Sequence, residues 1–252
     1  MRQMWGLTWK HRLLDLLLPE TCVGCLEDLP PPLGGPLCGR CLKLLRRFEP
    51  RFRPATRFRS GPLAVVCAAF PYRAPLPAVV HSFKYRRRLS AGRTLAAWMA
   101  GAWHRHPELG RADALVPVPL HPARERERGF NQALVLARAV AASARTPVIE
   151  PLARVENTAP QARRRRSDRP ALKTAFRAGK AAGLAGARLV LIDDVYTSGR
   201  TLEGCARTLR ASGAADVSAF VLACSHPSPT GRDAEVRGGN ARVPPPRGGT
   251  RK

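Results

Sequence analysis

Residues 189–202 read LVLIDDVYTSGRTL, and this stretch decides the fold. An apolar run ends in two acids, Asp193 and Asp194, and a short Thr-Ser-Gly turn at 197–199 leads into an amphipathic segment. This order predicts a buried β-strand, a tight turn and a helix with Thr201 in its first turn. Because open α/β sheets bind ligands beyond the carboxyl ends of their strands, we expect a ligand site at this turn.

The residue types of the stretch indicate the ligand's chemistry. Hydroxyl side chains, a glycine that lets the backbone approach closely and the free N–H groups of a helix start together suit a phosphate. Two adjacent carboxylates are poor neighbours for that phosphate, but they accept hydrogen bonds from hydroxyl groups. A ligand with a phosphate and a vicinal diol a few ångströms apart fits both halves, and ribose 5-phosphate has that shape.

Strand-like and helix-like segments alternate on both sides of this stretch. Alternation of this kind predicts an α/β fold, in which helices flank a parallel sheet joined by right-handed crossovers. We expect strands at 63–72, 113–120, 148–155, 188–195 and 216–224, and helices at 75–85, 89–103, 130–143 and 201–211.

The chain of 252 residues is strongly basic, with 43 Lys and Arg against 18 Asp and Glu and a formal net charge of +25. An Arg bias from a GC-rich genome explains this excess as well as a polyanionic partner such as a phosphorylated substrate, a nucleic acid or an acidic membrane surface. The charge argues against a cationic partner. With 44% hydrophobic residues the chain has enough apolar material for a packed core.

Four of the seven cysteines form two Cys-x-x-Cys pairs, at 22–25 and 38–41, on either side of a Pro- and Gly-rich stretch. So short a segment has almost no core of its own, and a tetrahedral metal ion is a sensible substitute. Four thiolates close the coordination sphere and leave no position for a substrate. We therefore predict a structural zinc site at Cys22, Cys25, Cys38 and Cys41.

Composition divides the chain into three parts. We expect an N-terminal helix, the cysteine module and an Arg-rich connector in 1–60, the α/β domain in 61–224, and a disordered basic tail in 225–252. No run approaches the roughly 18 apolar residues of a membrane-spanning helix, and the leucine-rich segment near the N-terminus does not read as an export signal. We accordingly expect a cytoplasmic location.

The stretch at 189–202 resembles the ribose-phosphate-binding motif of type I phosphoribosyltransferases. Two further segments, VPVPL at 116–120 with RGFNQ at 128–132 and HSFKY at 81–85, narrow the resemblance to the ComF family of competence-associated proteins, as does a four-cysteine module ahead of the transferase domain. The resemblance covers about residues 20–224. It implies a phosphoribosyltransferase-like sheet preceded by a small zinc-ribbon-like module.

The resemblance also implies roles for individual residues. Asp193 and Asp194 would hold the ribose hydroxyls, and the 5-phosphate would lie against Thr197, Ser198, Gly199, Arg200 and Thr201. The pyrophosphate of phosphoribosyl pyrophosphate, accompanied by Mg²⁺, would face Arg124, Arg126 and Arg128. The Arg-rich segment at 154–173, which includes Gln161 and Arg169, would be a mobile loop that closes over the site. The residues do not specify an acceptor base or amine, so phosphosugar binding, in DNA uptake or in nucleotide metabolism, is a firmer expectation than transfer.

A second function stays open beside the first. The resemblance implies a link to DNA uptake, in which a catalytically silent chain would bind single-stranded DNA or dock a competence helicase as an adaptor. The basic and aromatic residues Lys84, Tyr85 and Arg86 would contact phosphates and stack on bases. The structural alternative for this segment is a solvated helix end whose aromatic side chains belong to the core.

Overall fold

The structure is a computed structural model, and it describes residues 21–29, 35–46, 55–58, 60–85, 89–156, 175–179 and 184–225. Several expectations lie outside the described residues: the N-terminal helix, Arg86, the Arg-rich segment with Gln161 and Arg169, and the basic tail.

The main sheet has five strands in the order β1-β2-β7-β6-β3. The strands β2, β7, β6 and β3 run parallel to one another, and β1 pairs antiparallel with β2 at the edge. The expected α/β fold is confirmed, although the sheet is mixed and not purely parallel. The strands span Ala55–Arg57 (β1), Val65–Pro71 (β2), Ala114–Pro117 (β3), Arg188–Tyr196 (β6) and Asp216–Cys224 (β7).

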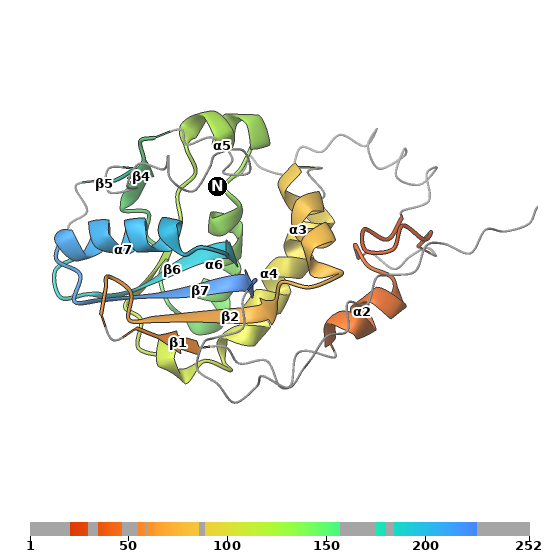
Figure 1. The fold of residues 1–252 in the computed structure, drawn as a ribbon, viewed down its shortest axis with the longest axis horizontal. Helices are drawn as coiled ribbons and strands as arrows, with labels where there is room; N and C mark the ends of the chain where they lie inside the picture. The colour runs from red at the N-terminus through yellow and green to blue at the C-terminus, as the bar shows by residue number, and fades with distance from the viewer. Residues whose placement is uncertain are drawn as a thin grey trace, which may run out of the picture.

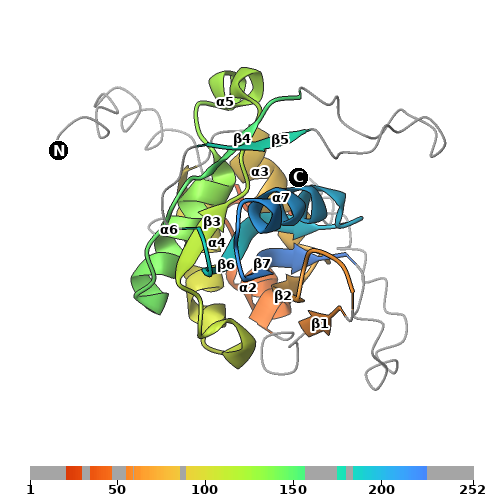
Figure 2. The same ribbon diagram turned by 90° about the vertical axis from the view of Figure 1, so that its left-hand side faces the viewer.

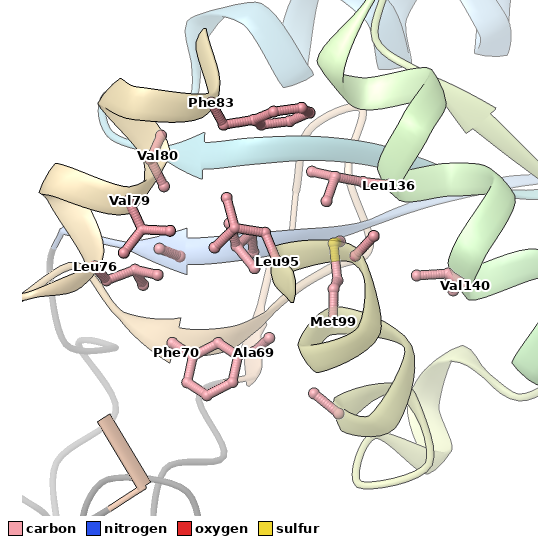
Figure 3. Close-up of a cluster of buried hydrophobic side chains, with 14 of the residues drawn as sticks. Ala69, Phe70, Leu76, Val79, Val80, Phe83, Leu95, Met99, Leu136 and Val140 are labelled. Atoms are coloured by element: carbon pink, nitrogen blue, oxygen red, sulfur yellow. The ribbon is translucent and has the colours of Figure 1, made fainter. Parts of the chain in front are cut away.

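Helices cover both faces of this sheet (Figures 1 and 2). The helices α3, α4 and α6 contribute to a hydrophobic cluster on one face, and α7 contributes to a second cluster on the other. Figure 3 shows the first cluster, in which Phe83, Leu95, Met99 and Leu136 meet over the strands. The helices span Gly39–Arg46 (α2), Leu76–Tyr85 (α3), Leu89–Trp103 (α4), Pro122–Arg128 (α5), Gln132–Ala144 (α6) and Arg200–Ala211 (α7), with a 3₁₀ turn, η1, at Pro107–Leu109.

The expected strand at 148–155 is divided in the structure. Val148 makes a single parallel bridge to Leu115 of the main sheet. Farther along, β4 (Leu152–Arg154) leaves that sheet and pairs antiparallel with β5 (Phe176–Ala178). This two-stranded sheet lies beside α5, at the same end of the molecule in both views (Figures 1 and 2).

The segment that was expected to connect the cysteine module to the α/β domain, residues 42–61, contains parts of two regular elements. Helix α2 continues to Arg46, and β1 adds an edge strand to the main sheet through the register pair Ala55 and Cys67. β1 therefore belongs to the α/β sheet and not to the cysteine module.

The cysteine module packs against the α/β domain without a break. Its buried residues, among them Leu37 and Cys41, belong to the same hydrophobic cluster as Leu76 of α3. Gly24 fits this junction because a Cβ there would lie 2.8 Å from Pro75 Cβ and 3.0 Å from Cys41 Sγ. The module and the start of α3 thus share one core.

Gly92 in α4 permits a close contact between α4 and Phe83 of α3. A Cβ at this position would lie 2.4 Å from Cε2 of the buried Phe83 ring. We expect Gly92→Ala to lower the free energy of unfolding by about 1–3 kcal/mol, because overpacking outweighs alanine's better helix propensity. Chemical denaturation of both proteins measures the difference.

Gly101 supplies the matched control for this change. It lies in the same helix, and nothing lies within 4 Å of a Cβ built there. Gly101→Ala should therefore leave stability unchanged or raise it by up to about 1 kcal/mol. Equal effects of the two substitutions would contradict the packing argument.

Candidate functional site

A pocket lies at the turn that joins β6 to α7. It holds about 240 Å³ of empty space, part of it open to solvent, and is lined by Asp193 and residues 195–202. Gly199 begins the helix with a φ of +74°, a conformation that side-chain-bearing residues rarely adopt. A Cβ there would also lie 2.9 Å from the Tyr196 hydroxyl oxygen. Glycine at this position therefore allows the turn that shapes the pocket and leaves room beside Tyr196.

The N-terminus of α7 supplies hydrogen-bond donors to this pocket. The first bond into the helix runs from the Glu203 N–H to the Gly199 carbonyl oxygen at 2.9 Å, so the preceding amides have no acceptor within the helix. Gly199 provides no side-chain cap. Thr197 and Ser198 are exposed beside these amides. Amides of a helix start together with two hydroxyls make a site suited to an anion.

The two acids of β6 have different surroundings. Asp193 lines the pocket, whereas Asp194 is 5% exposed and forms an ion pair through Oδ2 with Lys84 Nζ of α3. Successive residues of a strand point to opposite faces of the sheet, which accounts for the divergence. Asp193 Oδ1 also accepts a hydrogen bond from the Asp194 backbone N–H at 2.8 Å. Asp193 is therefore the acid that a ligand in the pocket meets.

The pKa values of Asp193 and Lys84 are both shifted by their surroundings. Burial, followed by repulsion from Asp194, raises the pKa of Asp193 to about 7, although the charge of Lys84 opposes this rise. Burial lowers the pKa of Lys84, but the attraction of Asp194 and the hydrogen bond that Lys84 donates to it outweigh this effect, so that the pKa is raised overall. At neutral pH Lys84 is charged and Asp193 is close to its midpoint.

Arg154, the first residue of the expected Arg-rich loop at 154–173, lies in β4 near the site, although the sequence indicated no role of its own for it. Burial and then repulsion from Arg124 lower the pKa of its guanidinium, while Cys205 and Asp193 act in the opposite direction. Its guanidinium carbon lies 5.6 Å from the centre of the Phe176 ring in β5. The β4–β5 pair therefore brings Arg154 into electrostatic contact with Asp193 at the end of β6, and α5 places Arg124 near Arg154.

The three expected pyrophosphate arginines of α5 differ in their surroundings. Arg124 and Arg128 are half-buried, and Arg126 is exposed. Arg128 donates to the Gln132 side-chain oxygen and lies over the Tyr85 ring, 5.4 Å from its centre. Arg124 is the member of the three that interacts with Arg154.

Of the three residues expected to contact DNA, two are described. Tyr85 is 63% exposed and its ring centre lies 4.8 Å from that of His81. The side chain of Lys84 is 20% exposed and faces Asp194. Tyr85, flanked by His81 and Arg128, is thus the outward-facing member.

The four N-terminal cysteines meet as predicted. Their sulfur atoms all lie within 4.8 Å of one another, and Cys25 Sγ and Cys38 Sγ are 3.6 Å apart. Sulfurs around a tetrahedral zinc ion are roughly 3.8 Å apart, which follows from a Zn–S bond of about 2.3 Å. The cluster is compatible with structural zinc.

Backbone amides prepare this cluster for a metal. Burial raises the pKa of Cys22, but hydrogen bonds from the backbone N–H groups of Cys38, Cys25 and Gly24 outweigh it and lower the pKa to about 7. Burial and the Cys22 charge raise the pKa of Cys41. A bound metal would supply a positive charge that stabilises the thiolate form of the remaining cysteines, which would lose their protons on binding.

Comparison with known proteins identifies the family. Competence protein ComFC of Bacillus subtilis (strain 168) is 30% identical over 227 residues, which cover 85% of this chain and 88% of that protein. The chain belongs to the ComF family. A second relative of this ComF-family chain, DNA utilization protein YhgH of Salmonella typhimurium, is 31% identical over 86% of the chain and 96% of its own length.

The phosphoribosyl transferase domain family matches residues 131–239 of the ComF-family chain, a range that includes the β6–α7 turn. Among solved structures, the glutamine phosphoribosylpyrophosphate amidotransferase from B. subtilis complexed with ADP and GMP is 16% identical, with a TM-score of 0.36 over 56% of this chain and 30% of that one. The family match and the sheet order together confirm the expected phosphoribosyltransferase-like fold.

None of the described helices is both long and apolar enough to cross a membrane.

Proposed function

We propose that this chain binds phosphoribosyl pyrophosphate or a related 5-phosphorylated ribose in the pocket at the β6–α7 turn, as a phosphoribosyltransferase-like protein of DNA uptake. The observation that carries the proposal is the pocket itself, because Asp193 and the turn 197–201, with its amides and hydroxyls, line the same cavity. The names of the relatives, a competence protein and a DNA utilization protein, support the link to DNA uptake.

Each part of the ligand has a partner in this proposal. The 5-phosphate lies at the start of α7, where the amides have no acceptor within the helix and the helix dipole favours an anion. The ribose hydroxyls donate to Asp193, which lines the pocket, whereas Asp194 stays paired with Lys84. The pyrophosphate lies toward Arg124 and Arg154, and Gln161 and Arg169 remain proposed contributors from the Arg-rich segment.

The acids and the pocket also fit Mg²⁺ carried in by the ligand. Magnesium prefers oxygen ligands and is commonly held by one or two carboxylates together with substrate phosphates. Bound Mg²⁺ would place a positive charge beside Asp193, whose pKa is raised to about 7, and would stabilise its carboxylate form. In this role the ion neutralises the pyrophosphate, and the protein's own arginines add to that effect.

Gly199→Ala tests the phosphate end of the pocket. We expect the affinity for phosphoribosyl pyrophosphate with Mg²⁺ to fall by about 10- to 100-fold, because amide bonds to a charged ligand contribute about 1.5–3 kcal/mol and the turn must shift to admit a Cβ. Titration calorimetry measures the change.

Gly186→Ala is the matched control for this variant. Gly186 has nearly the same φ, +73°, but nothing lies within 4 Å of a Cβ built there. Both variants carry the strain of a left-handed alanine, about 1–2 kcal/mol, and only Gly199→Ala should lose binding. Retention of full affinity by Gly199→Ala, or equal losses in both, would overturn the placement of the phosphate.

A second candidate function, single-stranded DNA binding, rests on the exposed Tyr85 ring with Arg128 over it and His81 beside it. An aromatic face next to the Arg128 cation is suited to a stacked base and its phosphate. In the same proposal a competence helicase would dock on the cysteine module.

This second function predicts a steep dependence on salt. If six or more phosphates are contacted, affinity for a single-stranded oligonucleotide should fall about 300-fold or more between 50 and 200 mM salt. Tyr85→Ala should remove about 1–3 kcal/mol of binding, the contribution of one stacked base. The exposed Val155 gives a control as Val155→Ala. A fluorescence titration with a flat salt response would count against the DNA-binding function.

A further inference from the structure

Three residues with metal-ligating side chains meet on the sheet face that α4 covers. They are Cys67 in β2, His106 just after α4, and Glu108 in η1. Cys67 Sγ, one imidazole nitrogen of His106 and one carboxylate oxygen of Glu108 all lie within 4.8 Å of one another. None of them belongs to the four-cysteine module or to the pocket at the β6–α7 turn.

The cluster is built into the core. Cys67 is fully buried and His106 is 2% exposed. The imidazole packs on the Phe220 ring, 5.5 Å between ring centres, and Phe220 is the register partner of Cys67 in β7. The ring of His106 is therefore held over the strand that carries Cys67.

Glu108 supplies the charge that this cluster has to accommodate. The residue is half-buried, but its Oε2 atom is shielded from solvent and receives no hydrogen bond from any described residue. Burying a carboxylate oxygen without a donor is unfavourable. A cation bound between Glu108, Cys67 and His106 would compensate this carboxylate and would give each of the three donors a ligand bond.

We propose that Cys67, His106 and Glu108 form a second transition-metal site, suited to Zn²⁺. Zinc accepts thiolate, imidazole and carboxylate ligands, and three protein ligands leave a fourth position for water. Bond lengths of about 2.0–2.3 Å bring tetrahedral donors to within roughly 3.2–3.8 Å of one another, so side-chain movements of about 1 Å complete the site.

The position of this site determines what the metal does. Cys67 pairs with the middle of β7, whereas the phosphosugar pocket lies beyond the carboxyl end of β6. The bound ion would tie η1 and the end of α4 to β2 and would not contact the phosphosugar. It stabilises the sheet face opposite α7.

Metal content of the full-length protein tests this proposal. After equilibration with zinc and removal of the excess, the unaltered chain should hold one zinc ion more than the Cys67→Ser variant, measured by mass spectrometry of the metal. Cys224→Ser, which alters a cysteine outside both clusters, should hold as much as the unaltered chain. Equal zinc content in all three proteins overturns the proposal.

A second variant covers the case in which Cys67→Ser does not fold. Glu108→Gln keeps the shape of a partly exposed side chain and removes the ligand charge. The affinity of this variant for Co²⁺ should fall by at least about tenfold, because even the loss of a residue that only contacts a metal ligand lowers metal affinity by about that factor. The visible absorption of bound Co²⁺, in competition with a chelator, measures the affinity. An affinity equal to that of the unaltered chain overturns the site and indicates an internal polar cluster only.

Discussion

Chains that carry Cys41→Ser should lose zinc from the four-cysteine module and melt at a lower temperature than the unaltered protein. Cys41 is fully buried, and its sulfur lies at the junction with Gly24. Zinc binding supplies about 10–16 kcal/mol in isolated zinc-finger peptides, and this free energy is also folding free energy. Even a fraction of it is large beside the roughly 5–15 kcal/mol that stabilises a whole domain.

The loss of structure in Cys41→Ser should begin in the cysteine module and extend in part to α3. We expect residues 21–46 to lose protection against hydrogen exchange, and α3 to follow in part, because Leu37 and Leu76 share one core. The central strands should stay protected. Cys224→Ser is the control, since Cys224 belongs to neither metal-ligand cluster. A Cys41→Ser protein with unchanged melting temperature and exchange would rule out a structural metal in the module.

The β6–α7 site could be predicted because its residues are continuous in sequence. One strand, one turn and the first turn of one helix hold Asp193 and the whole of 197–201. The residues that determine the local secondary structure are therefore the same residues that line the proposed ligand site. The strand β7, Asp216–Cys224, and the helix α4, Leu89–Trp103, have the predicted bounds for the same reason, since each carries an uninterrupted apolar pattern.

Contacts between distant segments could not be predicted in this way. The partner of Asp194 is Lys84, which comes from α3 and is brought to β6 by the packing of the helix on the sheet. Arg154 reaches the same region because β4 leaves the main sheet to pair with β5. No local pattern at either residue specifies these pairings.

Helix α5 was not predicted because it buries no residue, and its sequence therefore lacks the periodic pattern of apolar residues that indicates a helix. Its sequence, PARERER, contains only charged residues after Pro122 and Ala123. The signals it does carry are at its ends. The His121 side chain accepts a hydrogen bond from the Ala123 N–H at 3.2 Å, Pro122 begins the helix, and Gly129 ends it with a φ of +85°.

The affinity for phosphoribosyl pyrophosphate should rise with pH between about 6 and 8, as Asp193 ionises. Its pKa is raised to about 7, so the carboxyl group is mostly protonated below this pH and mostly a carboxylate above it. The carboxylate is the form that accepts hydrogen bonds from two ribose hydroxyls. Asp193→Asn should lower the affinity at pH 8 by about 10- to 100-fold, since bonds to a charged group contribute about 1.5–3 kcal/mol.

The Asp193→Asn variant distinguishes the ionisation of Asp193 from the ionisation of the ligand. A phosphate monoester has its own pKa near 6, which contributes equally to both proteins. The difference between the two pH profiles therefore belongs to Asp193. At pH 7 ligand binding should also release a fraction of a proton in the unaltered chain and less in Asp193→Asn, which calorimetry in buffers of different ionisation enthalpy measures. Parallel pH profiles would remove Asp193 from the ribose site.

Lys84→Met should move this transition to higher pH. The charge of Lys84 lowers the pKa of Asp193 against burial and the repulsion of Asp194, so its removal raises that pKa further. Because Lys84 pairs with Asp194 and not with the pocket, the plateau affinity at high pH should change less than the midpoint does. A lower plateau with an unmoved midpoint would instead mean that Lys84 contacts the ligand, and that its ion pair with Asp194 has no part in the ionisation of Asp193.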